Sequence, residues 1–327
     1  MKVGQIVARH QIEIVEAPIP DISTQPDGTL LVKPYQGAVC GSDIPCFTLE
    51  HPNYPLEIGK SLHECIGFVV ASKSPTFKEG DEVLSVPFGQ AGLAEYFFSN
   101  DQMTVSLVPF DRKSEMLMCQ PLGTVIWACR KLGNLLHQNV VVLGQGPMGL
   151  MFTHMMSNLG AKSVIAVDLQ KYRLEASQQM RATHIINAST ENLVKRVTAI
   201  TEGKMADLVV EAVGHQTETV NQCLDLVKRD GTILAFGVPD ENVYGSFRYG
   251  DFFRRNIRLI GSVIPDVQND YPLAMDMIAQ GRMNVSPILT HRLPFEEVQC
   301  GFELFAFRRD KAIKVILDFD SESASDL

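Results

Sequence analysis

The sequence lacks the features that would place it in a membrane or in a secretory pathway. No uninterrupted apolar run approaches the roughly 18 residues that a membrane-spanning helix needs. The first residues lead into the polar pair Arg9-His10 without an apolar signal region. We therefore expect neither a membrane anchor nor secretion.

Closely spaced cysteine pairs are also missing. The seven cysteines are scattered and odd in number, and none forms a CxxC pair. A chain of 327 residues is long enough to bury a core without disulfides. This use of cysteine predicts a protein of the reducing cytoplasm.

Positive charge is not concentrated anywhere along the chain. Lysine and arginine number 29 against 38 acidic residues, giving a net charge of −9, and no basic block exceeds pairs such as Arg254-Arg255. Because phosphate backbones are bound by concentrated basic faces, we do not expect a nucleic acid partner. A content of 45% hydrophobic and 20% charged residues is typical of a globular protein, and the length predicts about two domains.

The first third of the sequence predicts mostly β-structure. Short apolar segments alternate with turns that contain proline and glycine, as in the Pro26-Asp27-Gly28 turn. The segments expected to form strands are residues 2–14, 29–33, 65–71 and 81–86.

From about residue 122 the pattern changes to strands and helices in alternation, which predicts a parallel sheet with helices on both faces. The expected strands are 140–143, 163–168, 207–212, 232–236 and 258–262, with helices that include 127–132 and 148–159. A helix at 273–280 and strands at 290–293 and 312–319 follow, and this part is too short for a domain of its own. We therefore predict one domain over 1–121 that is completed by 265–327, and a second over 122–264. Residues 320–327 are acidic and serine-rich, and we expect them to fray.

A glycine-rich loop directly follows the strand predicted at 140–143. It reads Gly144-Gln-Gly146-Pro147-Met148-Gly149 and precedes a helix, which is the context of a dinucleotide-binding fingerprint. The first glycine allows the tight turn, the second lets a pyrophosphate approach the backbone, and the third permits close packing of helix on strand. We predict that Gly144, Gly146, Pro147, Met148 and Gly149 bind the cofactor phosphates at the helix N-terminus.

Asp168 ends the next predicted strand, 19 residues after Gly149. A carboxylate at this point binds a ribose 2′-hydroxyl and repels a 2′-phosphate, so NAD is favoured over NADP. Lys171 and Arg173 stand close enough to leave NADP open, and Arg173 is a further candidate for cofactor binding.

A thiol and an imidazole in the β-rich part point to a metal. Cys40 lies 23 residues before His63, which is followed by Glu64. Thiolate and imidazole are good zinc ligands, and a catalytic zinc needs three protein ligands and one open position. The residue types identify two of these ligands and leave the third open.

Taken in order, the motifs resemble those of the zinc-dependent medium-chain alcohol and polyol dehydrogenases over nearly the whole chain. They are residues 40–43, 63–67, 80–83, 94–96, 120–122, the 144–149 loop with Asp168, and 290–294. The resemblance implies an α/β protein with a GroES-like, mostly-β catalytic domain and a Rossmann domain with a doubly wound parallel sheet. It also implies a homodimer or homotetramer, and residues 120–130 are most similar to the sorbitol and threonine dehydrogenase branch.

Two departures from the family pattern concern the metal ligands. The family's third ligand is Cys or Glu, and the matching residue here is Gln120, whose neutral amide is a poorer zinc ligand. The resemblance therefore favours Cys40, His63 and Glu64 as ligands, with Gln120 as a weak ligand or as a residue that orients bound water; Cys119 or water could also take the third position. Leu62 stands where the family usually has glycine, which allows a shift of the loop.

Two further departures concern the proton path and the number of metals. Pro45 occupies the position of the family's relay histidine, so the proton must leave through water or another group. His51 is nearby in the sequence, but we expect it to be a plain surface residue. Only twelve residues separate Asp81 from Ala94, which leaves no room for the four-cysteine lobe of many relatives, so we expect at most one zinc.

By this resemblance Ser42 accepts the proton of the substrate hydroxyl, Asp43 fixes the imidazole of His63, and Glu64 is a ligand or an exchanging neighbour of the metal. The predicted function is reversible hydride transfer between NAD and a secondary alcohol or polyol, assisted by zinc. Two alternatives stay open: a zinc-free quinone or enoyl reductase of the same superfamily, and a non-catalytic NAD(H)-binding relative.

Overall fold

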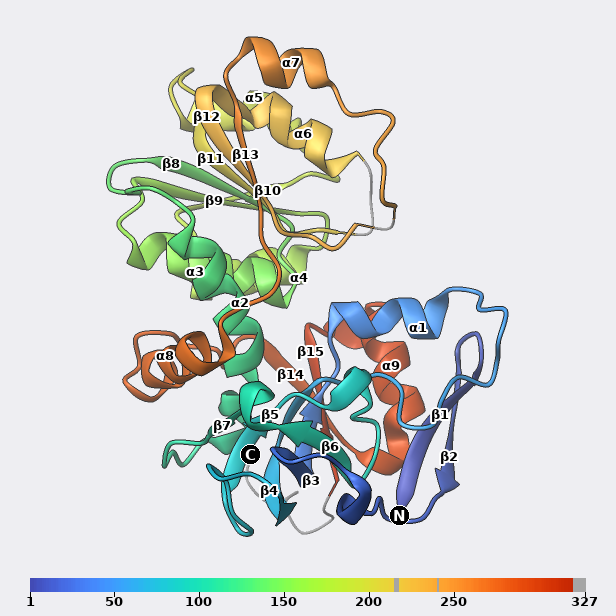
Figure 1. Cartoon of the computed structure of the whole chain (residues 1–327). Coiled ribbons are helices and arrows are strands. Elements are labelled where there is room, and N and C mark those ends of the chain that lie inside the picture. Colours follow the sequence, from blue (N-terminus) through green and yellow to red (C-terminus); the bar gives the residue numbers. More distant parts are fainter. Residues whose placement is uncertain (215–217, 240, 320–327) are drawn as a thin grey trace. The chain divides into compact units, whose positions relative to one another are not determined.

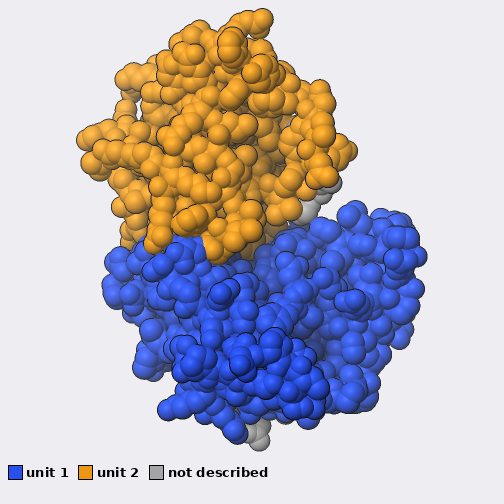
Figure 2. Space-filling view, viewed as in Figure 1, with its two compact units in different colours: residues 1–123, 266–327 blue, residues 124–265 orange. Residues whose placement is uncertain are grey.

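The computed structural model describes residues 1–214, 218–239 and 241–319 (Figure 1). The chain forms two compact units, one of residues 1–123 with 266–327 and one of residues 124–265 (Figure 2). The tail predicted to fray, 320–327, lies outside the described residues. No helix in the described part of the chain has both the length and the apolar character needed to cross a bilayer.

The first unit is built on antiparallel strands. Its larger sheet has the strand order β14-β15-β3-β4-β5-β7, with β6 also paired to β3, and only β14 and β15 run parallel. The strands are β3 (Thr29–Ala38), β4 (Glu64–Ser72), β5 (Glu82–Ser85), β6 (Phe97–Asn100), β7 (Thr104–Ser106), β14 (Leu289–Pro294) and β15 (Lys314–Asp318). A hairpin of β1 (Lys2–Ala8) and β2 (Gln11–Glu16) stands beside it, and the helices are α1 (Ile44–Thr48), α8 (Val267–Ala279) and α9 (Val298–Ala306).

The second unit contains a six-stranded parallel sheet with the order β10-β9-β8-β11-β12-β13. The strands are β8 (Asn139–Leu143), β9 (Ser163–Asp168), β10 (His184–Asn187), β11 (Ala206–Glu211), β12 (Val227–Ala235) and β13 (Arg258–Gly261). The helices are α3 (Pro147–Asn158), α4 (Lys171–Gln179), α5 (Leu193–Ile200), α6 (Thr219–Leu226) and α7 (Tyr249–Arg254). Within this unit α3 and α4 cover one face of the sheet and α5 and α6 the other (Figure 1). Helix α2 (Cys119–Arg130) begins in the first unit and continues into the second.

These two sheets confirm the predicted α/β fold class, a mostly-β domain together with a doubly wound parallel sheet. Each unit has its own apolar core: Phe47, Leu62 and Leu317 are among the buried side chains of the first, and Val141, Ile165 and Val209 among those of the second. The strand order places the carboxyl ends of β8 and β11 side by side at the centre of the sheet. Ligands bind at this point in sheets of this topology.

Several predicted elements have different bounds in the structure: the helix expected at 127–132 belongs to α2, which begins at Cys119, and the strand expected at 29–33 extends to Ala38. The apolar alternation over 2–14 is divided into two strands by a turn at Arg9-His10, where His10 has a φ of +63°. The helix expected at 273–280 begins at Val267, because Pro272 lies inside it instead of marking its start. The positions of the five predicted strands in the second unit are confirmed to within a few residues.

Candidate metal and cofactor sites

Three potential metal ligands converge in the first unit. The ligand atoms of Cys40, His63 and Glu64 all lie within 4.8 Å of one another. Cys40 follows strand β3 and His63 precedes β4, and these strands pair antiparallel with Ala38 opposite Glu64. The pairing of the two strands therefore brings together residues that are 23 positions apart in the sequence.

Asp43 lies beneath the imidazole of His63. It is fully buried, and its Oδ1 is 3.5 Å from Nδ1 of His63. The same carboxylate accepts hydrogen bonds from the backbone N–H of Cys40 (2.8 Å), the hydroxyl of Ser61 (2.9 Å) and the backbone N–H of Leu62 (2.8 Å). Burial alone would raise the pKa of Asp43, but His63 and these backbone donors outweigh it and lower the pKa. Asp43 is therefore a fixed anion, as expected for a residue that orients a metal-binding imidazole.

The other ring nitrogen of His63 is directed to Ser42, whose Oγ lies 3.5 Å from Nε2. The imidazole is buried, which disfavours a positive charge, but Asp43 and Cys40 outweigh burial and raise the pKa of His63. With Nδ1 turned toward Asp43, Nε2 is the atom available to a metal. Ser42 thus lies beside the ring nitrogen that is available to a metal.

Leu62 keeps the backbone conformation for which glycine is usually required. Its φ is +67° and that of Ser61 is +94°. The Leu62 side chain is wholly buried and packs over Gly37, where an added Cβ would lie 2.5 Å from Cδ2 of Leu62. Leu62 is therefore accommodated in this conformation because Gly37 opposite it leaves space for the side chain.

Glu64 forms an ion pair with a lysine that the sequence analysis did not identify. Nζ of Lys314 lies 2.7 Å from Oε1 and 2.6 Å from Oε2 of Glu64, and both side chains are buried. Burial opposes the charge on Lys314, but Glu64 and Cys40 outweigh it and raise its pKa. The sequence does contain one indication of this pair. Lys314 lies within the apolar segment 312–319, and a buried lysine is rarely found without an anionic partner.

Gln120, the remaining candidate ligand, forms a hydrogen bond with a tyrosine side chain. It is buried at the start of α2 and hydrogen-bonds with Tyr271 of α8. Burial raises the pKa of Tyr271, the Gln120 hydrogen bond opposes this, and the charge of Glu64 raises it further. Tyr271 therefore interacts with both residues: it forms a hydrogen bond with Gln120, and the charge of Glu64 acts on its hydroxyl.

Pro45 lies in α1, and its carbonyl oxygen is 3.2 Å from Nε2 of His51. His51 is half-buried, so it is held against α1 and does not extend freely from the surface.

Among the described residues, the one group of three or more Cys, His, Asp and Glu side chains that could hold a metal is Cys40, His63 and Glu64.

The donor set fits zinc. It offers a thiol, an imidazole and a carboxylate in a buried site, and both oxygens of that carboxylate also contact the ammonium group of Lys314. The roles of Cys40, His63, Glu64 and Gln120 as ligands stay predictions.

The glycine-rich loop connects β8 to α3 in the second unit. Gly144 has a φ of +89°, and a Cβ on Gly149 would lie 1.8 Å from the carbonyl oxygen of Gly144, so neither position tolerates a side chain. Gly146 is the N-cap of α3 and has open space around it, while Pro147 is the first residue of the helix and Met148 is half-buried. The open space above Gly146 fits the approach of a cofactor pyrophosphate.

Asp168 ends β9 beside this loop. Its Oδ2 accepts a hydrogen bond from the backbone N–H of Gln145 (2.7 Å), and its Oδ1 from that of Gln170 (2.8 Å). Nη1 of Arg173 is 3.9 Å from Oδ2 of Asp168, and Nε of Arg173 is buried without a hydrogen bond. The carboxylate and the guanidinium thus lie together at the edge of the loop, where the ribose of a dinucleotide binds.

Two residues that organise this end of the sheet were missed in the sequence. Gln145 is wholly buried under the loop, donates to the carbonyl of Val142 (3.0 Å) and accepts from Thr153 (2.9 Å). Glu211, at the end of β11, accepts hydrogen bonds from the backbone N–H groups of residues 213, 214 and 237, each at 3.1 Å. An acidic residue that ends a buried strand was the one signal for Glu211.

Comparisons with known proteins agree with this geometry. A family model described as zinc-binding dehydrogenase matches residues 147–280. The sorbitol dehydrogenase of Bacillus subtilis is 25% identical over 97% of this chain and 97% of its own length. The L-threonine 3-dehydrogenase of Bacillus licheniformis is 33% identical over 57% of this chain and 55% of its own length.

Solved structures show the same fold. The alcohol dehydrogenase TADH from Thermus sp. ATN1 superposes with a TM-score of 0.86 and 26% identity, covering 98% of this chain and 100% of that one. The matches thus extend over both units and include the ligand-bearing and the glycine-loop segments. Residues 147–280 thus carry a zinc-binding dehydrogenase domain, and nearly the whole chain is similar in sequence and fold to alcohol and polyol dehydrogenases.

Proposed function

We propose that this dehydrogenase interconverts a secondary alcohol or polyol and the corresponding carbonyl compound, with Cys40, His63 and Glu64 as zinc ligands. The protein is an oxidoreductase of CH–OH groups that uses a nicotinamide cofactor and zinc. The observation that carries the proposed ligand set is the convergence of the three ligand atoms within 4.8 Å. Sorbitol dehydrogenase and D-xylulose reductase among the relatives support a polyol as substrate.

When bound, zinc lowers the pKa of a coordinated hydroxyl, and the nicotinamide ring exchanges the hydride. The chain's own residues then have defined tasks. Ser42 accepts the hydroxyl proton of the substrate, since its Oγ lies 3.5 Å from Nε2 of His63. Asp43 fixes the imidazole from the opposite side, and the buried ammonium of Lys314 balances the charge of Glu64.

Gln120 is proposed as a weak ligand or as the residue that orients water at the metal. Its hydrogen bond with Tyr271 fixes the amide, which favours the orienting role. Because no histidine occupies position 45, the proton from Ser42 leaves through water or the cofactor ribose.

NAD is proposed as the cofactor in preference to NADP. Asp168 presents a carboxylate beside the glycine-rich loop, and a carboxylate repels a 2′-phosphate. Arg173 is 3.9 Å from that carboxylate and is therefore engaged with it. The proposed cofactor-binding set is Gly144, Gly146, Pro147, Met148, Gly149, Asp168 and Arg173.

The protein is further proposed to form a homodimer or homotetramer and to reside in the cytoplasm. Strand β13 is an edge of the parallel sheet, and Leu259, Val263 and Ile264 on and after it are exposed by 42%, 60% and 77%. An edge strand with apolar side chains favours pairing with a second copy. All seven cysteines are free thiols, as suits a reducing compartment.

The deciding experiment measures zinc content and activity in the same preparations. Protein purified without chelator is expected to hold about one zinc per chain and to reduce NAD with a polyol such as sorbitol. The variant Cys40→Ser is expected to lose both zinc and turnover, because a neutral hydroxyl replaces the thiolate. Ser42→Ala is expected to keep the zinc and lose turnover.

Other results would overturn the proposal. Enoyl or quinone reduction without zinc would identify the zinc-free reductase of the superfamily. NADH binding without turnover on any alcohol would identify a non-catalytic relative.

A further inference from the structure

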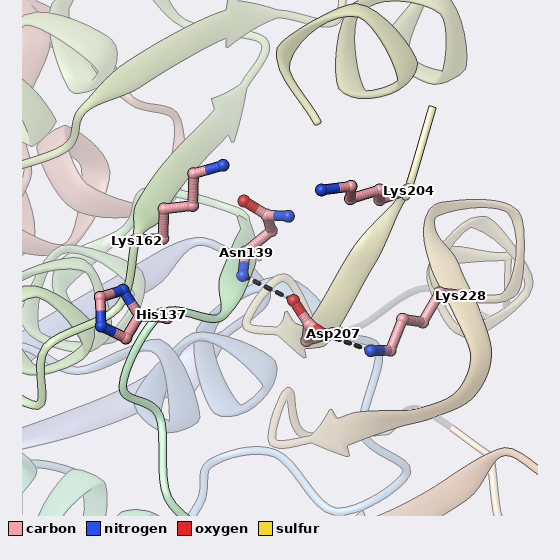
Figure 3. A pocket seen from close by; sticks show the side chains of 6 residues that line it. All are labelled: His137, Asn139, Lys162, Lys204, Asp207 and Lys228. Atoms are coloured by element: carbon pink, nitrogen blue, oxygen red, sulfur yellow. Dashed lines mark hydrogen bonds and ion pairs between the residues drawn. The ribbon is translucent and has the colours of Figure 1, made fainter. Parts of the chain in front are cut away.

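A hollow of about 400 Å³ lies at the amino ends of the parallel strands of the second unit (Figure 3). Its lining comes from the starts of β8, β11 and β12 and from the loops before β8, β9 and β11. The lining residues are His137, Asn139, Lys162, Lys204, Asp207 and Lys228. The glycine-rich loop follows the other, carboxyl end of β8, so this hollow is separate from the proposed cofactor site.

Only one of the three lysines that line the hollow is neutralised. Lys228 forms an ion pair with Asp207, whose Oδ2 also accepts a hydrogen bond from the backbone N–H of Asn139 (2.7 Å). In the described part of the chain, no carboxylate lies within ion-pair distance of the ammonium groups of Lys162 or Lys204. The hollow therefore carries two uncompensated positive charges on a protein whose net charge is −9.

The amide of Asn139 adds a donor that suits an anion. Oδ1 of Asn139 accepts a hydrogen bond from Ser163 (2.8 Å), so its Nδ2 is the part of the amide left to donate into the hollow. Figure 3 shows the side chains of Lys162 and Lys204 reaching toward the Asn139 amide from opposite sides. Ammonium groups and an amide donor arranged around one space form charge-assisted hydrogen bonds with phosphate oxygens.

We propose that this hollow binds a small molecule that carries one or more phosphate groups. Its volume is in the range of ligand pockets and exceeds what one orthophosphate would fill. A phosphate between Lys162 and Lys204 would neutralise both charges and accept from Nδ2 of Asn139. The proposal does not depend on the substrate or the metal of the proposed dehydrogenase.

The test is calorimetric titration of the NADH-saturated enzyme, because bound NADH keeps phosphate probes out of the glycine-rich loop. The two probes are inorganic pyrophosphate and fructose 1,6-bisphosphate. At least one is expected to bind, and the variant Lys162→Gln/Lys204→Gln is expected to weaken this binding by about tenfold or more, since it removes two charge-assisted contacts to phosphate oxygens. Tighter binding of the first probe would assign an inorganic polyphosphate, and of the second an organic phosphate ester.

Lys195→Gln is the matched control, because Lys195 is an exposed lysine of the same unit outside the hollow. It is expected to leave the affinity unchanged, and all three substituted lysines are exposed, so the variants should fold. The proposal is overturned if neither probe binds at millimolar concentration. It is equally overturned if the double variant and Lys195→Gln bind the probes as the unchanged protein does.

Discussion

Leu62 combines a left-handed backbone with a wholly buried side chain, and it directly precedes the proposed ligands His63 and Glu64. Holding a non-glycine residue in this conformation costs about 1 to 3 kcal/mol. Burying a leucine side chain contributes about 1.5 to 3 kcal/mol, which offsets the strain. Gly37 therefore supplies the space that lets Leu62 hold this left-handed conformation with its side chain buried.

Substitutions at the two positions should be strongly coupled. Gly37→Ala places a methyl group 2.5 Å from Cδ2 of Leu62 and should reduce the free energy of unfolding by about 1 to 3 kcal/mol. Leu62→Gly should reduce it by about 2 to 4 kcal/mol, because the cavity outweighs the relief of strain. In the double variant the methyl group meets no leucine, so urea denaturation should show a loss smaller than the sum by about 1 kcal/mol or more. Simple additivity would contradict this account of the loop.

The buried pair of Glu64 and Lys314 predicts an asymmetry between single and double variants. Lys314→Met leaves a buried carboxylate without its cation and should destabilise the protein by about 3 to 5 kcal/mol. Adding Glu64→Gln removes the stranded charge and should restore most of that loss. Urea denaturation in the presence of a chelator measures the effect without a contribution from the metal. If the double variant is no more stable than Lys314→Met, the loss in Lys314→Met does not come from the unpaired charge of Glu64.

At the scale of elements, Glu211 holds together the ends of two central strands. It terminates β11, and its carboxylate accepts N–H groups from the loop after β11 and from the segment after β12. Gly237 approaches so closely that an added Cβ would lie 2.5 Å from Oε2 of Glu211. The carboxylate thus fixes the backbone at the edge where this fold binds its cofactor.

Glu211→Gln should therefore weaken cofactor binding as well as stability. One carboxylate oxygen becomes an NH2 group that faces a backbone donor, which should cost about 1 to 3 kcal/mol and raise the dissociation constant of NADH severalfold. Fluorescence titration with NADH measures the affinity, and Glu175→Gln on the exposed side of α4 is the control. Reduced stability with unchanged affinity would show that Glu211 only supports the sheet.

Helix α3 places a histidine where it must stay neutral. His154 is 2% exposed, its Nδ1 accepts a hydrogen bond from Asn158 (3.2 Å), and burial lowers its pKa to about 4. The unfolded chain binds this proton near its ordinary pKa of about 6.5, so stability should fall as the pH drops from about 6.5 to about 4. His154→Gln should flatten the pH dependence of the free energy of unfolding by about 1 kcal/mol per pH unit in that window. Identical slopes for the two proteins would contradict the assignment.

Most helices and strands and the glycine-rich loop could be predicted from the sequence, because the patterns that indicate them lie within a few neighbouring residues. The apolar runs of β8, β9 and β13 and the spacing of Gly144, Gly146 and Gly149 are read within a few residues. The start of α8 could not, because Pro272 normally marks a helix start and only packing decides that this helix begins five residues earlier.

The metal site was predictable only in part. The motif residues Cys40, His63 and Glu64 could be named because they lie within a short span of sequence. Lys314 could not, since 250 residues separate it from Glu64 and only the pairing of β15 with β3 brings them together. Likewise, the backbone conformation of Leu62 depends on Gly37 across the sheet, which no local pattern reveals.

For the whole molecule, the two units differ in how they are assembled from the sequence. Residues 124–265 are contiguous and contain a complete sheet and core, whereas residues 1–123 lack β14, β15 and α9. An isolated 124–265 fragment should therefore unfold cooperatively and bind NADH, while a 1–123 fragment should not unfold cooperatively. Circular dichroism melts and NADH titration distinguish the two. A cooperative transition in the 1–123 fragment would show that its sheet does not need the returning strands.

Strand β15 pairs with both β14 and β3, and it also carries the cation that allows Glu64 to be buried. A ribosome makes Cys40, His63 and Glu64 early and Lys314 only after the entire cofactor-binding unit has emerged. Until then the carboxylate must stay hydrated, because burying it alone is too costly. We therefore expect the proposed metal site to take its final form only after β15 has paired with β3.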